Sequence, residues 1–599
     1  MLTLNTIRIE KNIPFQMYLL SDRLVKKLNK EFEFYNVRFY REECVREPTV
    51  CVDYPYGNMY WYTDFKKFIK TEILEKDVRY ESEWNNLLDR MKRAISSEFT
   101  AFQNAINSVT AKDVVEYMNL YSLRDYQAFD LLQLKAKMKF NEGNGLILSE
   151  QRTGKTRVAL AAMLESAYPG DNVLIVCPPA AVSGWRDECI FYCDSKHLSL
   201  RTRVIRKIKD IKDLEHDWSD LHINVNILTY NLFKMLTVPQ TRTVCGTSHS
   251  KNLIFIGDEV HRLRNFKTMQ SDAIFSFKDL CKRDKVNLKV IGVTGTPAVK
   301  DSSDVFGSLC LINTSKISFQ PYYKDFNQFK EYFYNCEDTS YGKVCKSLRR
   351  VDELNHLIQT VSVQTKQREL DMFKNYTKKY LKVSLNMDSE QRAAYTSVRD
   401  TMGYGDDIDC MNGLVQLLRL QQLCIDPSGL VSAYEGVAPK VQWVIEFAKK
   451  NDFQFIVFAK KTKVFETLIN QLESNDIPYS LIRGGMSVYE RDKETFNFKS
   501  GKSKVYLIQL DAGRESLTLP EAKCTVFLDR DYAQGFNEQA EARMTPVDGS
   551  ECTKYVIDLI MNDTVEEGIY DILVMRKESI ENINTVKSYL KKGGETNGV

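Results

Sequence analysis

The stretch GLILSEQRTGKTRVALAAML, residues 145–164, decides how the chain is organised. Its first apolar letters, residues 146–148, predict a buried strand. After Thr156, apolar residues recur at helical spacing through residues 158–164, which predicts an amphipathic helix. The polar letters SEQRTGKT, residues 149–156, therefore form a loop between a strand and a helix.

A loop with this composition is suited to binding polyphosphate. Its backbone N–H groups can surround phosphate oxygens along Arg152, Thr153 and Gly154, and Gly154 permits the closest approach. Lys155 would reach the β and γ phosphates, and the Thr156 hydroxyl would bind Mg²⁺. The general P-loop pattern has a further glycine at the place of Ser149, so the match is incomplete. Taken alone, the same letters also fit a surface helix that begins with TGKT.

Composition limits the class of protein. A chain of 599 residues is too long for one core, and 43% hydrophobic with 27% charged residues is typical of soluble globular domains. We find neither an apolar run of about 20 residues nor a signal-peptide core, so we expect an intracellular protein without a membrane segment. The 14 cysteines lack metal-site spacing, which favours buried free thiols, and a net charge of +3 does not by itself indicate nucleic-acid binding.

Four more apolar runs predict further strands of one parallel sheet. Strands separated by helices run parallel, and the loops at their carboxyl ends open on one edge of the sheet. The runs are residues 173–177 before Pro178 and Pro179, residues 223–228 before Thr229, residues 253–256 before Asp258, and residues 290–293 before TGTP at residues 294–297.

Two adjacent carboxylates follow the third of these runs. In a P-loop nucleotide hydrolase Asp258 would hold Mg²⁺, and Glu259 would position and deprotonate the attacking water. His261 can relay between the nucleotide and the TGTP turn. A lone acidic pair after a strand is more often a solvated turn, but here it follows the phosphate loop by about a hundred residues.

The first 115 residues carry no motif that we can assign. Residues 49–52 predict a strand and residues 83–95 a helix. Five aromatic residues between positions 54 and 62 could stack on bases, although such clusters more often form the core of a small domain.

The motifs, taken in order, resemble those of the Snf2 branch of superfamily 2 helicases. They are LRDYQ (residues 123–127), TGKT, CPPAAVSGWRDE (177–188), LTY (228–230), DEVHRLRN (258–265) and TGTP. The resemblance implies that Gln127 reads adenine, next to Arg124, because a glutamine amide can donate and accept together.

The second half of the chain continues the resemblance. LLRLQQLCIDPSGL (417–430) looks like the helical element before the second lobe, which Lys440 opens. Predicted strands at residues 455–458 and 505–510 flank a helix at 464–472 and the strand-end turn at Arg483 and Gly484. Gln539 and Arg543, in QAEAR, resemble the arginine-finger motif, whose arginine stabilises transition-state charge.

The chain departs from the family pattern at three places. The motif's second arginine is replaced by Pro546, Asp511 stands where arginine is usual, and Arg152 occupies a loop position usually held by glycine. These departures concern catalytic rate and coupling more than the fold.

The resemblance implies an α/β protein with two RecA-like P-loop lobes built on parallel sheets, a helical insertion between them and a small N-terminal α+β region. The expected boundaries are an accessory region at 1–115, lobe 1 at 116–315, a mostly helical insertion at 316–435, lobe 2 at 436–575 and a tail at 576–599.

The implied function is a DNA-dependent ATPase that uses ATP and Mg²⁺ to move along or remodel duplex DNA. Phosphate contacts would give little sequence preference, and we expect them at Ser183, Trp185, Thr229, Arg483 and Gly484. The compact build favours replication, recombination or repair in a phage or prokaryotic cytoplasm or nucleoid over a eukaryotic nuclear remodeller. Two alternatives stay open: a strand-separating helicase, whose pin hairpin we cannot locate, and a weakly catalytic DNA-binding scaffold, suggested by Pro546.

Overall fold

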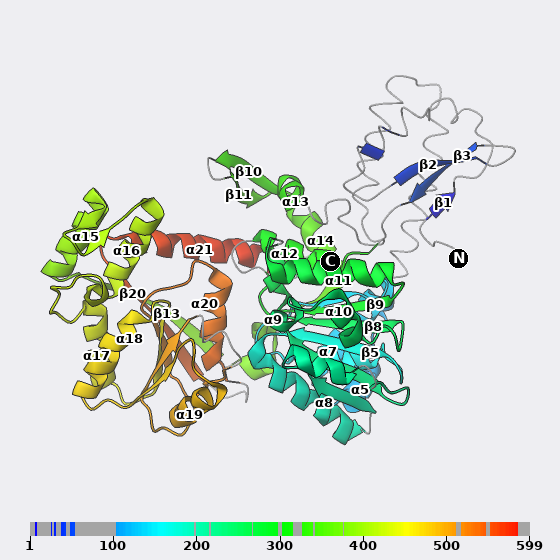
Figure 1. Cartoon of the computed structure of the whole chain (residues 1–599), viewed down its shortest axis with the longest axis horizontal. Coiled ribbons are helices and arrows are strands. Elements are labelled where there is room, and N and C mark those ends of the chain that lie inside the picture. The colour runs from blue at the N-terminus through cyan, green and yellow to red at the C-terminus, as the bar shows by residue number, and fades with distance from the viewer. Residues whose placement is uncertain are drawn as a thin grey trace, which may run out of the picture. The chain divides into compact units, whose positions relative to one another are not determined.

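The computed structural model describes residues 6–8, 26, 29–30, 38–43, 48–53, 104–196, 199–214, 217–265, 267–297, 302–314, 326–339, 342–374, 376–510, 517–546 and 552–584. The chain divides into two compact units (Figure 1). The first unit comprises Met1–Pro297, Ser303–Thr365 and Val586–Val599, and the second comprises Ala298–Ser302 and Lys366–Thr585.

The first unit is built on a seven-stranded sheet in which every neighbouring pair is parallel. In spatial order the strands are β12 (Ser362–Val363), β4 (Gly145–Ile147), β9 (Asn287–Val293), β8 (Asn252–Asp258), β5 (Asn172–Cys177), β7 (Ile223–Thr229) and β6 (Leu200–Val204). The five strands predicted from apolar runs are all present.

The register of the central strands brings three predicted motifs together. Ile147 of β4 pairs with Val293 of β9, and Val293 pairs with Asp258 of β8. The phosphate loop, the TGTP turn and the acidic pair therefore leave the same edge of the sheet on three adjacent strands.

Alternate side chains of this sheet face different helices. Ile254 and Ile256 belong to a core that includes residues of α5, α6, α7 and α8. Phe255 points the other way and packs against Phe277 of α11, with ring centroids 5.4 Å apart. The helices of the first unit are α5 (Ala111–Tyr121), α6 (Asp125–Phe140), α7 (Lys155–Leu164), α8 (Val182–Lys196), α9 (Tyr230–Phe233), α10 (Val238–Cys245), α11 (Met269–Arg283), α12 (Val305–Leu311), α13 (Phe326–Phe333) and α14 (Val351–Val361).

The second unit is built on a six-stranded, fully parallel sheet. Its strands, in spatial order, are β13 (Tyr376–Leu385), β20 (Cys552–Met561), β19 (Cys524–Phe527), β16 (Phe455–Ala459), β18 (Val505–Gln509) and β17 (Tyr479–Ile482). Two RecA-like lobes with parallel sheets are thus confirmed.

Side chains that alternate along the strands of the second unit also pack against different helices. Phe455 and Val457 pack with α17 (Pro439–Lys450) and α18 (Lys463–Ser474). Ile456 and Phe458 pack with α19 (Val488–Lys499) and α20 (Gln534–Glu541), so the helix of the predicted arginine-finger motif lies on this second face. The remaining elements are α15 (Ser389–Thr401), α16 (Gly413–Ile425), α21 (Val565–Asn584) and the short pair β14 (Gly403–Tyr404) and β15 (Ile408–Asp409).

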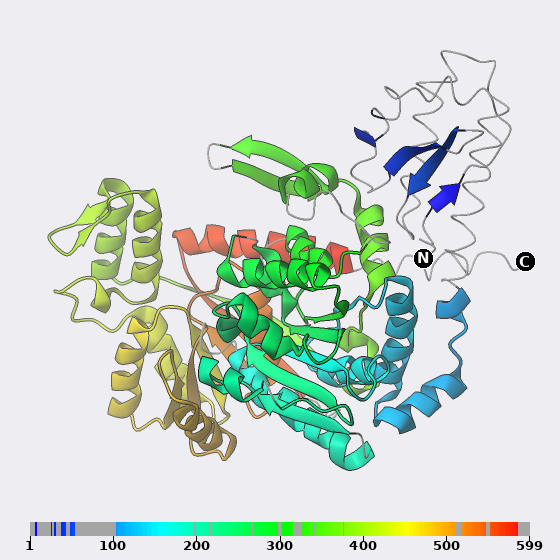
Figure 2. The same cartoon turned by 45° about the vertical axis from the view of Figure 1, so that its right-hand side comes forward.

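The segment expected to be a mostly helical insertion, residues 316–435, also contributes strands to both sheets. β12 forms an edge of the first sheet, and β13 forms an edge of the second. The segment also contains the hairpin of β10 (Tyr334–Thr339) and β11 (Gly342–Leu348), which stands away from the first sheet next to α13 in both views (Figures 1 and 2). Sequence patterns missed it because neither strand carries a strong apolar run.

The N-terminal region contains an antiparallel sheet of β1 (Thr6–Arg8), β3 (Pro48–Asp53) and β2 (Arg38–Glu43), in that order. The strand predicted at residues 49–52 is confirmed. The predicted helix at 83–95 and the aromatic cluster at 54–62 lie outside the described residues.

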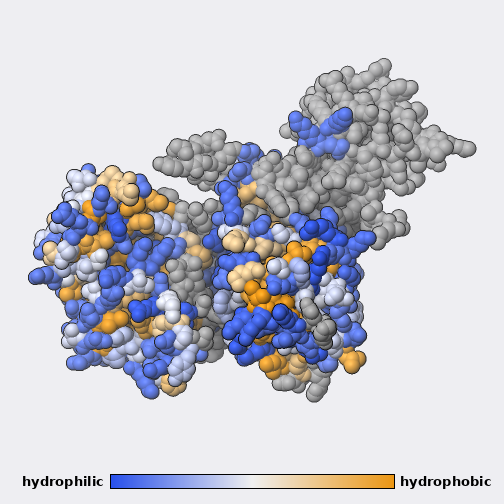
Figure 3. Space-filling view, viewed as in Figure 1, coloured by the Kyte–Doolittle hydropathy of each residue, from blue (hydrophilic) through white to orange (hydrophobic). Residues whose placement is uncertain are grey.

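One face of the described surface is largely hydrophilic (Figure 3), and most cysteines with described side chains are buried. Figure 3 shows a face on which hydrophilic residues predominate and apolar patches are scattered. Among the helices that the structure describes, none has the length and apolar character needed to cross a bilayer. Ten cysteines whose side chains the structure describes are free, and eight of these ten are buried.

Candidate nucleotide-binding site

The loop between β4 and α7 has the backbone conformation of a tight anion-binding turn. Gly154, which caps α7, has φ 76°, and a Cβ atom there would lie 2.1 Å from Nε2 of Gln127. Only glycine fits this position. Arg152 has φ 66°, in the left-handed region that a glycine would adopt without strain. Arginine at position 152 therefore strains the backbone, which the family's usual glycine would not do.

Gln127 is held against the loop by both ends of its amide. The Arg124 N–H donates to Gln127 Oε1 at 2.9 Å, and Gln127 Nε2 donates to the Thr153 carbonyl at 3.1 Å. The Tyr126 hydroxyl donates to the same carbonyl at 3.1 Å. Gln127, the residue predicted to read adenine, thus contacts the phosphate loop directly.

Lys155 begins α7 and turns back over the loop. Its ammonium donates to the Glu150 carbonyl at 3.0 Å. Burial lowers the pKa of Lys155, against the opposing effect of the Glu259, Asp258 and Glu150 carboxylates. A bound triphosphate would offer this ammonium a better anionic partner than a carbonyl.

Asp258 ends β8 and is tied to α8. Its Oδ2 accepts a hydrogen bond from Trp185 Nε1 at 2.9 Å, and its Oδ1 accepts one from the Glu259 N–H at 3.0 Å. Burial, followed by the adjacent Glu259 charge, raises the pKa of Asp258 to about 7. A divalent cation would compensate this buried carboxylate.

Glu259 is held in place by residues of the third motif. Thr294 Oγ1 donates to Glu259 Oε2 at 3.1 Å, and Nδ1 of the buried His261 lies 3.1 Å from the same oxygen. Burial would raise the pKa of Glu259, but the hydrogen bond and charge of His261, the Lys155 charge and the Thr294 hydrogen bond lower it to about 2. Glu259 also has φ 52°, so its backbone is held in the left-handed region.

The TGTP turn packs between the other two loops. A Cβ atom at Gly295 would lie 2.6 Å from Gln151 Nε2 and 2.9 Å from Lys155 Nζ, so the turn packs directly against these two side chains of the phosphate loop. His261 Nδ1 lies 2.9 Å from Thr294 Oγ1 and 3.4 Å from Thr296 Oγ1. The motif pattern alone predicts no separate role for Thr294. Its hydrogen bond to Glu259 depends on the pairing of β8 with β9.

The donor set suits Mg²⁺ bound together with a nucleotide. Within the described ranges no group of three His, Cys, Asp or Glu residues could hold a metal ion. Mg²⁺ often uses only one or two protein oxygen ligands and completes its octahedron with water and substrate phosphates. The Asp258 carboxylate and the Thr156 hydroxyl, at the carboxyl end of β8 and the start of α7, fit that chemistry.

The second unit carries the other predicted nucleotide contacts. Gln539 is buried in α20, and Arg543 follows in a short 3-10 turn, where its Nη1 donates to the Leu517 carbonyl at 3.3 Å. Pro546 is buried. Asp511 lies outside the described residues.

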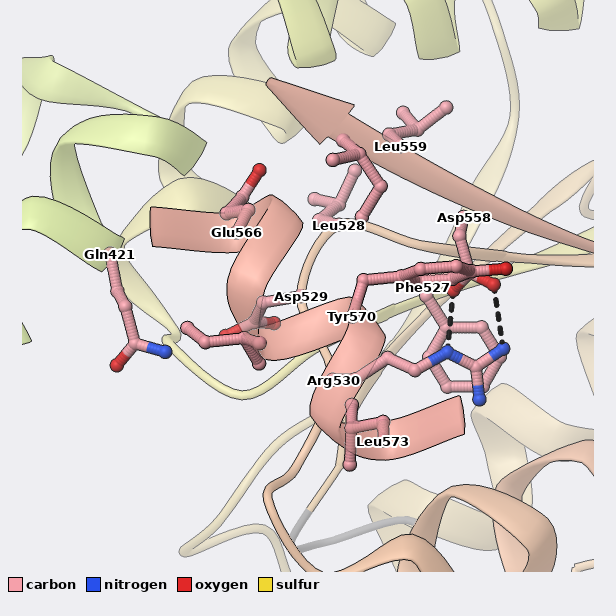
Figure 4. A pocket seen from close by; sticks show the side chains of 12 residues that line it. Gln421, Phe527, Leu528, Asp529, Arg530, Asp558, Leu559, Glu566, Tyr570 and Leu573 are labelled. Atoms are coloured by element: carbon pink, nitrogen blue, oxygen red, sulfur yellow. Dashed lines mark hydrogen bonds and ion pairs between the residues drawn. The ribbon is translucent and has the colours of Figure 1, made fainter. Parts of the chain in front are cut away.

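A buried ion network supports the helix that bears this motif. Arg530 binds Asp558 of β20 through Nε at 2.5 Å and Nη2 at 3.0 Å, and Glu541 of α20 through Nη1 at 2.7 Å. The Tyr380 hydroxyl of β13 donates to the same Glu541 at 3.0 Å. Figure 4 shows Arg530 and Asp558 at the wall of a pocket lined also by Tyr570 and Leu573 of α21.

The predicted nucleic-acid contacts fall into two groups. Ser183, Arg483 and Gly484 are exposed, and Thr229 is half-buried at the start of α9, where it caps the helix. Trp185 differs from the prediction because it is 1% exposed and its N–H is bonded to Asp258. Its indole is covered, so we assign it to positioning Asp258 instead of contacting nucleic acid.

Replacing Arg152 separates backbone strain from ligand binding. Arg152→Gly should raise the free energy of unfolding by about 1 kcal/mol through release of the left-handed strain. It should also weaken ATP binding by about tenfold, the effect of losing one charge-assisted hydrogen bond. Lys285→Gly, at φ 53°, is the matched control. The Lys285→Gly variant should have a higher free energy of unfolding and an unchanged ATP affinity, which calorimetry measures. Unchanged ATP affinity in Arg152→Gly would contradict a phosphate contact.

Two protein-family models match this chain. The SNF2-related domain model matches residues 114–428, which is 315 of the 599 residues, and the helicase conserved C-terminal domain matches residues 439–545. The chain is 23% identical over 493 residues to "Chromodomain-helicase-DNA-binding protein 1-like" of Danio rerio, covering 78% of this chain and 45% of the relative. It is 22% identical over 454 residues to "DNA repair and recombination protein RAD54B" of Gallus gallus, covering 68% and 47%.

The chain thus spans a little under half the length of these curated relatives. Among solved structures, the "Sulfolobus solfataricus SWI2/SNF2 ATPase core in complex with dsDNA" has a TM-score of 0.32 and 18% identity, over 77% of this chain and 92% of that one. The family match, which covers more than half of the chain and every motif of the first unit, shows that the chain belongs to the SNF2-related family.

Proposed function

We propose that the chain hydrolyses ATP with Mg²⁺ at the first unit and uses the energy to move along or remodel duplex DNA. The observation that carries the proposal is the set of loops at the ends of β4, β9 and β8. They place Lys155, the Asp258 and Glu259 carboxylates, and Thr294 at one sheet edge.

Each residue has a distinct chemical task in this proposal. Lys155 and the loop N–H groups bind the phosphates, while Gln127 and Arg124 contact the adenine. Asp258 and Thr156 hold Mg²⁺, which neutralises charge on the β and γ phosphates when bound. Glu259 orients the attacking water. With so low a pKa it takes the proton only as the new bond to phosphorus forms.

The second unit supplies the charge that completes catalysis in this proposal. Arg543 is the proposed arginine finger, a guanidinium that stabilises negative charge in the transition state of hydrolysis. Gln539 lies on α20, just before the 3-10 turn that carries Arg543, and the Arg530 network binds α20 to β20. The Pro546 ring cannot replace the second arginine because it has no donor.

DNA is the partner that the relatives support. The names of the two relatives include "DNA-binding" and "DNA repair and recombination". We infer contacts to phosphates from the exposed Ser183, Arg483 and Gly484 and from the half-buried Thr229, and hence weak sequence preference. The domain boundaries and the phage or prokaryotic setting expected from the sequence stay predictions.

Strand separation is a second candidate because of the β10–β11 hairpin. It gives the first unit a projecting two-stranded element of the kind that a separating helicase needs. A displaced strand from forked DNA would favour it over translocation on intact duplex.

The test is phosphate release measured with no DNA, single-stranded DNA, duplex and fork. We expect stimulation by duplex and fork. Glu259→Gln should keep ATP binding and lose turnover, because it touches the attacking water, whereas Lys155→Ala should weaken binding itself. Normal turnover in Glu259→Gln would contradict the role assigned to Glu259. A wild-type chain that binds DNA but does not hydrolyse ATP would favour the alternative of a weakly catalytic DNA-binding scaffold.

The arginine finger is tested by two variants. Loss of a finger typically lowers turnover by about 10³ to 10⁵. Arg543→Ala should show this loss with little change in ATP affinity, since the finger acts in the transition state. Arg514, which lies outside the described residues, is the alternative, and we expect Arg514→Ala to be mild. Near-normal DNA-stimulated rates in both variants would mean that neither residue is the finger.

A further inference from the structure

Ser149, where the general P-loop has a glycine, is fully engaged in hydrogen bonds. It is 2% exposed. Its hydroxyl accepts the Thr365 N–H at 3.1 Å and donates to Asp130 Oδ2 at 3.4 Å. A glycine could make neither bond. The departure from the pattern therefore adds a specific connection between the loop and Thr365.

Thr365 occupies a special place in the chain. It ends the Ser303–Thr365 segment of the first unit, and Lys366 begins the Lys366–Thr585 segment of the second. Its hydroxyl donates to Asp130 Oδ2 at 2.5 Å, and its carbonyl accepts the Glu150 N–H at 2.9 Å. All three polar groups of Thr365 thus bind either the phosphate loop or the helix behind it.

Glu150, whose N–H binds Thr365, also binds the phosphate-binding Lys155. The Glu150 carbonyl accepts from Lys155 Nζ at 3.0 Å, while the Glu150 N–H binds Thr365. Asp130 lies one turn after Gln127 on α6, so one helix face supports both ends of the loop. A bound phosphate would draw Lys155 Nζ away from the Glu150 carbonyl. The N–H of this same Glu150 is hydrogen-bonded to Thr365, so the lysine would move next to that bond.

We propose that Asp130, Ser149 and Thr365 form a latch that couples phosphate binding to the point where the chain leaves the first unit. The latch rests on the proposed function, since it transmits nucleotide binding toward the unit that carries Arg543. Its members are positioning residues, because they act through Glu150 and the loop backbone.

The experiment compares Thr365→Val, which keeps the shape and removes the hydroxyl, with wild type. DNA stimulation of phosphate release should fall at least about fivefold, the lower end of ordinary coupling between sites. ATP affinity without DNA should be unchanged. Thr365→Ser should restore the stimulation. Ser149→Ala should lose it too, and the double variant should be no worse than the more severe single one.

Ser362→Ala is the matched control, because its hydroxyl binds only the Ile358 carbonyl among the bonds described and does not touch the loop. It should keep full stimulation. Thermal unfolding of every variant checks that the chain is folded. Full stimulation in folded Thr365→Val, or an equal loss in Ser362→Ala, overturns the latch. A wild-type chain without DNA-stimulated hydrolysis overturns the proposed function as well, whereas stimulation that the latch variants leave intact overturns the latch alone.

Discussion

The candidate site depends on the parallel pairing of β4, β9 and β8. Because Ile147, Val293 and Asp258 share one register, the phosphate loop, the TGTP turn and the acidic pair emerge side by side. The Glu259 carboxylate can then accept from Thr294 on the neighbouring strand, with His261 beside it. A shift of one residue in this pairing would turn the side chains to the opposite face and separate these groups.

Two of the eight described non-glycine residues with positive φ lie at the candidate site. Arg152 and Glu259 both have positive φ, and neither is glycine. The Glu259 carboxylate accepts a hydrogen bond from Thr294 Oγ1 and lies 3.1 Å from His261 Nδ1. Such positions persist when the structure around them leaves no alternative. Contacts within the chain therefore hold the Glu259 side chain at the site.

Sequence patterns predicted the five inner strands of the first sheet because these are continuous apolar runs. In the second sheet they predicted β16 and β18 but named no strand at β19 or β20. They missed the edge strands: β6 and β13 are partly exposed and carry arginine or lysine, and β12 is only two residues long. Lys155, Asp258 and Glu259 could be found from motif spacing. The task of Trp185 could not, because its indole N–H is bonded to a carboxylate 73 residues away. The latch at Ser149 was likewise invisible, since Thr365 is 216 residues distant.

The most direct test of the account is a crystal structure of the chain with ADP, beryllium fluoride and Mg²⁺. We predict that Lys155 Nζ leaves the Glu150 carbonyl for the phosphate analogue, that Asp258 and Thr156 face the metal, and that Glu259 stays bonded to Thr294 beside the attacking position. A nucleotide bound elsewhere, or a phosphate analogue out of reach of Lys155 and Glu259, would contradict it.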